Sequence, residues 1–250
     1  MSSNSSSYHA LAAVYDQLMG DAPYDQWIEF AQKQWAHLGL KPRTVIDLAC
    51  GTGTITSLLV EYGYQLIGVD LSEDMLAVTY DKLKEKGRSI QLYQQDMREL
   101  KVPSSVDAIV CFCDSISYLT EDLDVQKTFH RVYEALNPGG VFLFDIHSPY
   151  KVNEVFGNET YTLSEEDIAY IWQCYSLGND TVQHELDIFV KEDEFYQRYE
   201  EIHQQRGYST TSIQQWLMEA GFVEIESTAD FLEQQPAENS ERLFFRAIRR

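Results

Sequence analysis

Val45-Ile46-Asp47-Leu48-Ala49-Cys50-Gly51-Thr52-Gly53-Thr54 is the stretch that decides the fold of this chain. An apolar, β-branched strand leads into a glycine turn, and the turn leads into a helix. The next strand, Leu66-Ile67-Gly68-Val69, ends at a second acid, Asp70. This spacing predicts a βαβ unit whose first turn holds a nucleotide-like cofactor at the carboxyl edge of a parallel sheet.

The same turn distinguishes between two kinds of cofactor. A dinucleotide-binding turn has a small third residue, and this chain has Thr56 there. Asp47, at the end of the strand, would repel a pyrophosphate, but it suits an ammonium group such as that of the methionine part of S-adenosylmethionine (SAM). The sequence therefore favours SAM. A nicotinamide or flavin cofactor is the first alternative, and a glycine turn that binds nothing is the second.

Strands and helices alternate through residue 146, which predicts parallel strands joined by right-handed crossovers. The expected strands are 45–49, 64–70, 90–94, 106–112, 141–146, 222–228 and 242–249, and the expected helices are 8–20, 25–38, 54–62, 73–86, 121–136 and 211–220. The predicted fold class is α/β, with a doubly wound, seven-stranded, mostly parallel sheet of the Rossmann-like kind.

The pattern changes to a period of two between about 160 and 204. Segments 168–175, 181–191 and 195–203, with a hairpin turn at 177–180, predict a three-stranded antiparallel insertion after the fifth strand. We expect a disordered tail over 1–7, a cofactor-binding domain over 8–150 and 208–250, and the insertion over 151–207. The insertion either covers the cofactor as a lid or forms a homodimer surface.

Charge and composition narrow the partners. The 250 residues include 19 basic and 40 acidic side chains, for a net charge of −21, which disfavours nucleic acid as a partner. Arg242, Arg246, Arg249 and Arg250 form the one basic cluster, which we interpret as solvated strand ends. Between residues 158 and 204, 12 acidic and two basic residues leave a net −10. This excess either favours an amine substrate or is a solvated acidic face.

Location and metal content follow from other features of the sequence. No apolar run approaches the length of a membrane span, and the serine-rich start does not resemble a signal peptide. Four cysteines suit a reducing compartment, and the spacing of Cys111 and Cys113 is not that of a zinc site. We therefore expect a cytoplasmic protein with no metal site and no membrane partner.

The stretch from Val45 to Ile146 resembles the class I SAM-dependent methyltransferases, and the whole chain resembles uncharacterised bacterial members. In that resemblance the glycine turn lies against the methionine part, Asp70 grips both ribose hydroxyls, and Asp96 and Met97 lie beside adenine. The cofactor-binding residues that the resemblance implies are Tyr15, Asp47, Ala49, Gly51, Gly53, Asp70, Leu71, Met75, Asp96, Met97 and Cys113. Tyr15 either covers the cofactor or is a core aromatic residue.

The implied reaction is SAM-dependent methyl transfer to N or O of a small molecule. Such transfer mainly needs alignment and exclusion of water, and a base only where the acceptor arrives protonated. His147 is the preferred general base, with a structural histidine as the alternative. Tyr118, Tyr150 and Arg206 are the candidate substrate residues, although Arg206 could instead form a salt bridge to the acidic insertion.

Two other functions remain open on the sequence alone. One is methylation of RNA or protein, and the other is SAM binding without turnover in a regulatory protein. No Asn-Pro-Pro-Tyr or Asp-Pro-Pro-Tyr tetrapeptide follows the fourth strand, and no Pro-Cys pair occurs in the chain. Methylation of nucleobases by those two routes is therefore disfavoured.

Overall fold

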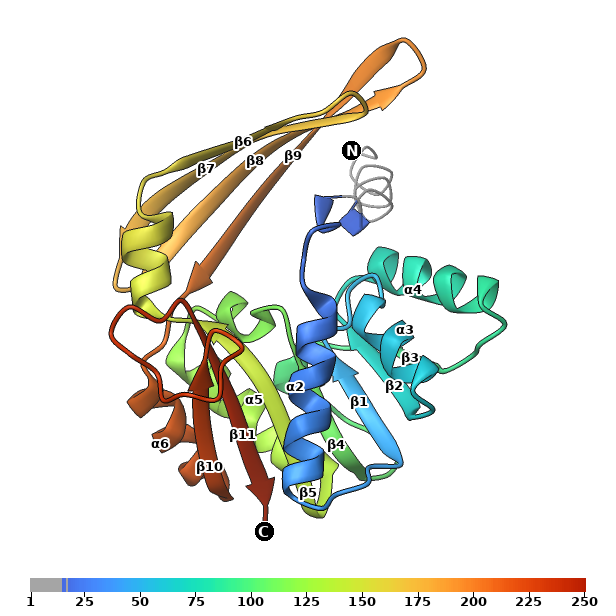
Figure 1. Ribbon diagram of the computed structural model, residues 1–250, viewed down its shortest axis with the longest axis vertical. Coiled ribbons are helices and arrows are strands. Elements are labelled where there is room, and N and C mark those ends of the chain that lie inside the picture. The colour runs from blue at the N-terminus through green and yellow to red at the C-terminus, as the bar shows by residue number, and fades with distance from the viewer. Residues whose placement is uncertain (1–14, 17) are drawn as a thin grey trace.

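The computed structural model of the protein describes residues 15, 16 and 18–250 (Figure 1). The predicted tail over 1–7 and most of the predicted helix over 8–20 lie outside the described residues. None of the described helices is long and apolar enough to cross a membrane.

A seven-stranded sheet forms the centre of the molecule, in the order β10-β11-β5-β4-β1-β2-β3. Its strands are β1 (Thr44–Leu48), β2 (Gln65–Asp70), β3 (Gln91–Gln94), β4 (Val106–Cys111), β5 (Leu136–His147), β10 (Phe222–Ala229) and β11 (Arg242–Arg249). β1 pairs in parallel with both β2 and β4, while β11 runs antiparallel to both of its neighbours. The predicted doubly wound, mostly parallel sheet is therefore confirmed.

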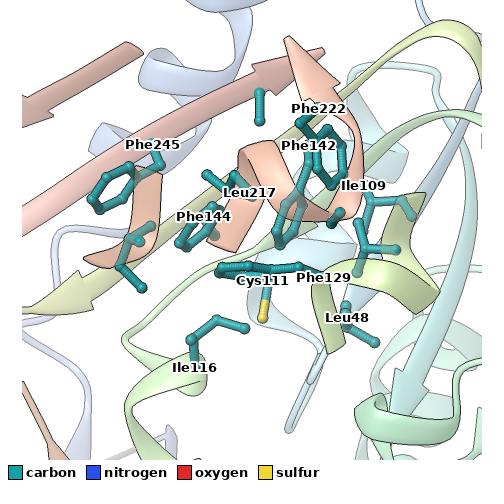
Figure 2. Packing of buried hydrophobic residues seen from close by; sticks show 14 of the residues in the cluster. Leu48, Ile109, Cys111, Ile116, Phe129, Phe142, Phe144, Leu217, Phe222 and Phe245 are labelled. Carbon is teal, nitrogen blue, oxygen red and sulfur yellow. The ribbon is translucent and has the colours of Figure 1, made fainter. Parts of the chain in front are cut away.

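Helices cover both faces of this sheet. They are α2 (Tyr24–His37), α3 (Thr54–Glu61), α4 (Glu73–Glu85), α5 (Asp122–Ala135) and α6 (Thr210–Ala220). Successive strand residues point to opposite faces, so Val45 packs in the cluster that contains α2 and α3, while Ile46 packs with α5 and α6. Figure 2 shows the cluster that contains Ile46, in which Phe129 lies beside Phe142 and Phe144. The rings of Phe142 and Phe144 stack with 4.6 Å between their centroids.

A second sheet, which we call the arm sheet, consists of β6 to β9 in antiparallel order. Its strands are β6 (Thr160–Ser164), β7 (Ile168–Gly178), β8 (Thr181–Glu192) and β9 (Phe195–Arg206). The sequence predicted three of these strands and missed β6. β6 does alternate, with Tyr161 and Leu163 partly buried between exposed threonine and serine side chains, but the pattern spans only five residues and none of them is fully buried.

The arm sheet extends from the end of the molecule at which β1 and the other parallel strands finish (Figure 1). A six-residue π-helical turn, Lys151–Phe156, connects β5 to it. Cross-strand pairing places Val182 opposite Gln205, His184 opposite His203, and Ile188 opposite Tyr199. These residues share one face of the arm sheet. We call it the inner face, because its residue Gln205 contacts Asp114 of the central domain.

Candidate active site

The loop between β1 and α3 has the backbone conformation that its glycines predict. Gly51 and Gly53 have φ angles of 54° and 76°, and Ala49 also lies in the left-handed region at 60°. A Cβ atom on Gly53 would lie 2.6 Å from the Thr79 methyl, whereas one on Gly51 would meet nothing within 4 Å. The loop is therefore packed against α4 at Gly53 and open at Gly51, where an extended ligand could lie against its backbone.

Asp47 is buried directly beneath this loop, with 2% of its surface exposed. The Thr56 hydroxyl donates a hydrogen bond of 2.5 Å to its Oδ2. Burial raises the pKa of Asp47 to about 7, with a further contribution from Asp70, although the Thr56 bond opposes the rise. Thr56 is thus the functional residue that the sequence analysis used only to exclude a dinucleotide, and it stabilises the ionised carboxylate.

Asp70 ends β2 with its carboxylate turned toward the glycine loop. Its Oδ2 accepts the Gly51 N–H and its Oδ1 accepts the Ser72 N–H, each at 2.8 Å. Burial raises the pKa of Asp70, and these backbone bonds oppose the rise. Each carboxylate oxygen has more than one acceptor site and so retains acceptor capacity beside these bonds, which fits a ligand with two adjacent hydroxyls. Leu71, beside it, is 66% exposed.

Asp96 and Met97 follow β3. The Asp96 carboxylate accepts the Arg98 N–H at 2.9 Å and forms an ion pair of 2.5 Å with the Arg98 guanidinium. That hydrogen bonding holds the pKa of Asp96 below its usual value. Arg98 also contacts Asp124 of α5, at 2.8 Å. The carboxylate predicted to lie near adenine is therefore already fixed in orientation by Arg98, a partner that the sequence analysis did not assign.

The N-terminal segment contacts both the glycine loop and the arm sheet. Asp16 accepts a 2.6 Å hydrogen bond from Thr52 and pairs with Lys82 of α4 at 2.6 Å. Leu18 packs against the apolar cluster on the inner face of the arm sheet. Burial raises the pKa of the Tyr15 hydroxyl, and Tyr118 raises it further, so the two phenols are neighbours. This segment therefore lies beside the predicted cofactor loop.

A buried ion-pair network lies at the carboxyl ends of β4 and β5. Arg242 of β11 pairs with Asp145 and, at 2.9 Å, with Asp114. Trp27 donates its indole N–H to Asp145 at 2.8 Å, and the Arg242 guanidinium lies over the Trp27 ring. Asp114 also accepts a 2.8 Å bond from Gln205 of the arm sheet. The network thus connects the two sheets through side chains.

The interpretation of the terminal arginines as solvated strand ends is wrong for two of them. Arg242 pairs with the buried Asp145 and the partly buried Asp114, and Arg246 is 3% exposed and pairs with Glu226 at 2.5 Å. The reason is that β11 lies inside the sheet, between β5 and β10, so its alternate side chains face covering elements rather than water.

His147, the predicted general base, is 4% exposed at the end of β5. Its Nε2 lies 3.3 Å from Asp114 Oδ2, and its ring packs edge-on against Phe156. Burial alone would raise the pKa of Asp114, but His147 and Arg242 hold it well below its usual range. A role of His147 as general base therefore stays a prediction. Its observed contact is with Asp114, whose ionised form it stabilises.

The predicted substrate residues lie in different places. Tyr118 is 51% exposed, and its ring meets that of His203 edge-on, 5.9 Å between centroids. Tyr150 precedes the π-helical turn and is partly buried. Arg206 donates to the Thr120 carbonyl at 2.9 Å and pairs with Asp122 at the start of α5, so its salt bridge is not the predicted one to the acidic insertion. It follows Gln205 in the strand and therefore points to the opposite, outer face.

Cys113 follows β4 with a left-handed φ of 56°, and burial raises the pKa of its thiol. Met75 is partly buried in the first turn of α4, where its N–H donates to Ser72. The structure therefore brings the glycine loop, Asp70, Cys113 and the N-terminal segment to one edge of the central sheet. Arg206 lies on the opposite face of β9 from His203.

Comparison with known proteins identifies this architecture. A methyltransferase-domain family matches residues 45–140. A protein of Geobacillus sp. (strain WCH70), named "Putative methyltransferase", is 44% identical over 95% of this chain and 98% of its own. A SAM-dependent methyltransferase from Clostridium acetobutylicum has a TM-score of 0.89 at 30% identity, covering 96% of this chain and 98% of its own.

A parallel sheet with a glycine turn and an acid at the end of its second strand defines a nucleotide-type cofactor enzyme. The chain belongs to the class I SAM-dependent methyltransferases, and SAM is its cofactor. SAM-bound CalS10, an amino pentose methyltransferase from Micromonospora echinaspora, shares the fold, with a TM-score of 0.76 at 18% identity over 95% of this chain and 97% of its own.

The residues at the sheet edge fit this cofactor. Asp70 offers two acceptor oxygens to a ribose diol, and Gly51 leaves open backbone for the methionine part. Asp47 lies under the same loop, where an ammonium group would favour its ionised form. When bound, the cofactor supplies an activated methyl group on a sulfonium.

Proposed function

We propose that this protein transfers a methyl group to a nitrogen or oxygen atom of a small-molecule acceptor, held between the carboxyl edge of the central sheet and the inner face of the arm sheet. The observation that carries this proposal is the position of Tyr118. Its half-exposed ring follows β4 at the cofactor edge and also meets His203 of the arm sheet. A group bound there would touch both walls.

In this proposal residues 151–207 act as the lid of the site. Asp114 contacts the lid through Gln205 at 2.8 Å, and the N-terminal segment contacts it through Leu18. These contacts support a role in aligning the acceptor and excluding water, which are the main requirements of methyl transfer. Tyr15, next to Tyr118, would complete the wall nearest the cofactor.

A small acceptor suits the charge of the protein better than a nucleic acid does. The net charge of −21 would repel phosphate chains. The similarity to an amino pentose methyltransferase concerns the fold, and in that protein the fold serves a small sugar substrate. Methylation of RNA or protein, and binding without turnover, are the competing functions.

We also propose that the protein acts in the cytoplasm. We further propose that it forms a homodimer, in which a second copy of the chain covers the outer face of the arm sheet. That face exposes three large apolar side chains, Ile171, Tyr175 and Ile202. Light scattering at micromolar concentration tests the second part, since a monomer unaffected by concentration contradicts it.

The first experiment is calorimetric titration with S-adenosylhomocysteine and, in parallel, with NADH. We expect binding of the first alone, weakened in Asp70→Ala and unchanged in Glu73→Gln, an exposed acid on the neighbouring helix. Methyl-labelled SAM is then supplied with pools of amines, sugars, hydroxylated compounds, RNA and protein.

Label in a small-molecule pool supports the proposal. Label in RNA or protein alone, or cofactor binding with no labelled product in any pool, contradicts it in favour of one of the two competing functions.

A further inference from the structure

Glu201 and His203 form a pair on the inner face of the arm sheet. They are two residues apart in β9 and so point the same way, and His203 Nε2 lies 3.3 Å from Glu201 Oε2. The Glu201 side chain is only 12% exposed, while that of His203 is 36% exposed. In the described part of the chain, His203 is the one basic side chain that pairs with Glu201.

The pair faces the same space as the cofactor edge. The Tyr118 ring meets the His203 ring edge-on, with 5.9 Å between centroids. Burial raises the pKa of the Tyr118 phenol, and the charges of Asp114 and Glu201 raise it further. Tyr15 is a neighbour of Tyr118 on the cofactor side. Farther along the inner face, Leu18 and Tyr199 both pack against the cluster of Ile168 and Ile188. The Glu201–His203 pair thus lies on the arm sheet and faces the other two walls of the proposed acceptor site, which are the segment after β4 and the N-terminal segment.

The other two histidines near this space are buried, at 4% and 3% exposed, and each has one ring nitrogen in a polar contact and one without a partner. His147 is enclosed between Asp114 and Phe156. His184, opposite His203, accepts the Trp172 indole N–H at 3.0 Å on its Nδ1, and burial lowers its pKa to about 4. It is therefore neutral at working pH. His203 alone is both partly exposed and next to an acid without another cation.

Burial also prepares this pair for a cationic ligand. It raises the pKa of Glu201 and lowers that of His203. A carboxylate in this position gains from a positive partner, and a lowered pKa keeps the imidazole neutral, the form that can accept a proton. The titratable groups around His203 are Glu201 on its own strand, His184 on β8, Tyr118 after β4, and, one contact farther, Asp114 and His147.

We propose that Glu201 and His203 receive the ammonium group of an amine acceptor: Glu201 pairs with the cation, and His203 accepts one of its protons. The inference rests on the proposed function and adds its substrate class and its base. The proton passes from the ammonium nitrogen to His203. The freed lone pair then forms the N–C bond to the methyl carbon, while the electron pair of the breaking C–S bond stays on sulfur.

The charges balance in this step. Glu201 stabilises the imidazolium that forms, and the nitrogen carries the positive charge that the sulfonium loses. The product is a methylated ammonium group beside the same carboxylate. An alcohol acceptor would leave the Glu201 charge without a cation, so the site discriminates between acceptors that differ only in having an amine in place of a hydroxyl.

The test compares matched acceptors, glucosamine with glucose and ethanolamine with ethylene glycol, using methyl-labelled SAM. We expect label in the amines. In His203→Gln the rate should fall roughly 100-fold near neutral pH, and the acid limb of the pH profile of kcat/KM should move toward the pKa of the amine itself. Glu201→Gln should raise KM for the amine about 10-fold.

Two controls separate the outcomes. Glu200→Gln removes an acid from the outer face of the same strand, where it is 69% exposed and pairs with Arg198, and it should change nothing. S-adenosylhomocysteine affinity should be equal in all variants, which shows that the fold and the cofactor site are intact. Loss of that affinity in the wild type would contradict the proposed function rather than this inference.

A second readout does not depend on turnover. In ¹⁵N-histidine-labelled protein with S-adenosylhomocysteine bound, millimolar glucosamine or ethanolamine should shift the His203 resonances and raise its pKa, less so in Glu201→Gln. Equal labelling of the alcohols, an unchanged pH profile in His203→Gln, or no effect of either amine on His203 would each overturn the inference.

Discussion

Asp47 makes the stability of this protein depend on pH in a way that one substitution can isolate. Its pKa is about 7 in the folded protein, against 3.8 for an ordinary aspartate. A carboxyl group with a raised folded pKa is protonated more readily in the folded state, so its ionisation weakens folding as pH rises between these two values. Compared with a group whose pKa is the same in both states, the raised pKa of Asp47 lowers the free energy of unfolding by about 1.5 kcal/mol at pH 5 and about 4 kcal/mol at pH 8.

Asp47→Asn removes this term while keeping the shape of the side chain, and the Thr56 hydroxyl can still donate to the amide oxygen. The difference in unfolding free energy between variant and wild type should therefore shift in favour of the variant by about 2.5 kcal/mol from pH 5 to pH 8. With a urea m-value of about 2–3 kcal/mol/M, this is a relative shift of about 1 M in the midpoint.

The assay is urea unfolding followed by circular dichroism at both pH values. Asp81→Asn, an exposed acid on α4, is the matched control and should show no pH-dependent difference. The variant should also bind S-adenosylhomocysteine more weakly, because it cannot offer a charge to the ligand ammonium. A midpoint difference that is the same at pH 5 and pH 8 would refute the assigned pKa and the reasoning from burial.

Four further substitutions test other parts of the structure. Asp70→Ala should weaken S-adenosylhomocysteine binding by about 1.5–3 kcal/mol in calorimetry, since a charged acceptor of the ribose diol is lost. Arg242→Met should destabilise the fold by about 3–5 kcal/mol in urea unfolding, because the fully buried Asp145 loses its cation and Asp114 loses one of its partners. Gly53→Ala should lower thermal stability by about 1–3 kcal/mol, given its left-handed φ and the 2.6 Å approach to Thr79. His147→Ala should leave cofactor affinity unchanged, and turnover of an identified acceptor decides its role, because normal turnover removes it as a base and leaves that part to His203.

The cofactor half of the site could be predicted from the sequence because its parts are local. The glycine turn, Thr56 and Asp70 lie within one βαβ unit, and the positive φ angles at Gly51 and Gly53 follow from residue type. Parallel pairing of β1 with β2 then places Asp70 beside the loop. The seven-stranded sheet was predictable for the same reason, since each strand and each crossover leaves its own pattern.

The acceptor half could not be predicted in this way, because its contacts join distant residues. Gln205 contacts Asp114 across 91 positions, and Arg242 reaches Asp145 across 97. Sequence patterns show that a strand has two faces, but they do not show which face turns toward another sheet. The terminal arginines were misjudged on this ground.

The face of β9 that turns inward decides which residues can take part in chemistry. A shift of one residue in its pairing with β8 would turn Arg206, Gln204 and Ile202 toward the cofactor edge, and Gln205, His203 and Glu201 toward water. The observed register is stabilised by β8, because its Val182 and Ile188 side chains are fully or almost fully buried on the inner face. The exposure of Ile202, 66%, is the consequence of this choice. The alternation of β8 could be predicted from the sequence. Its pairing with β9 then determines that Glu201 and His203 lie on the same inner face as the buried residues of β8.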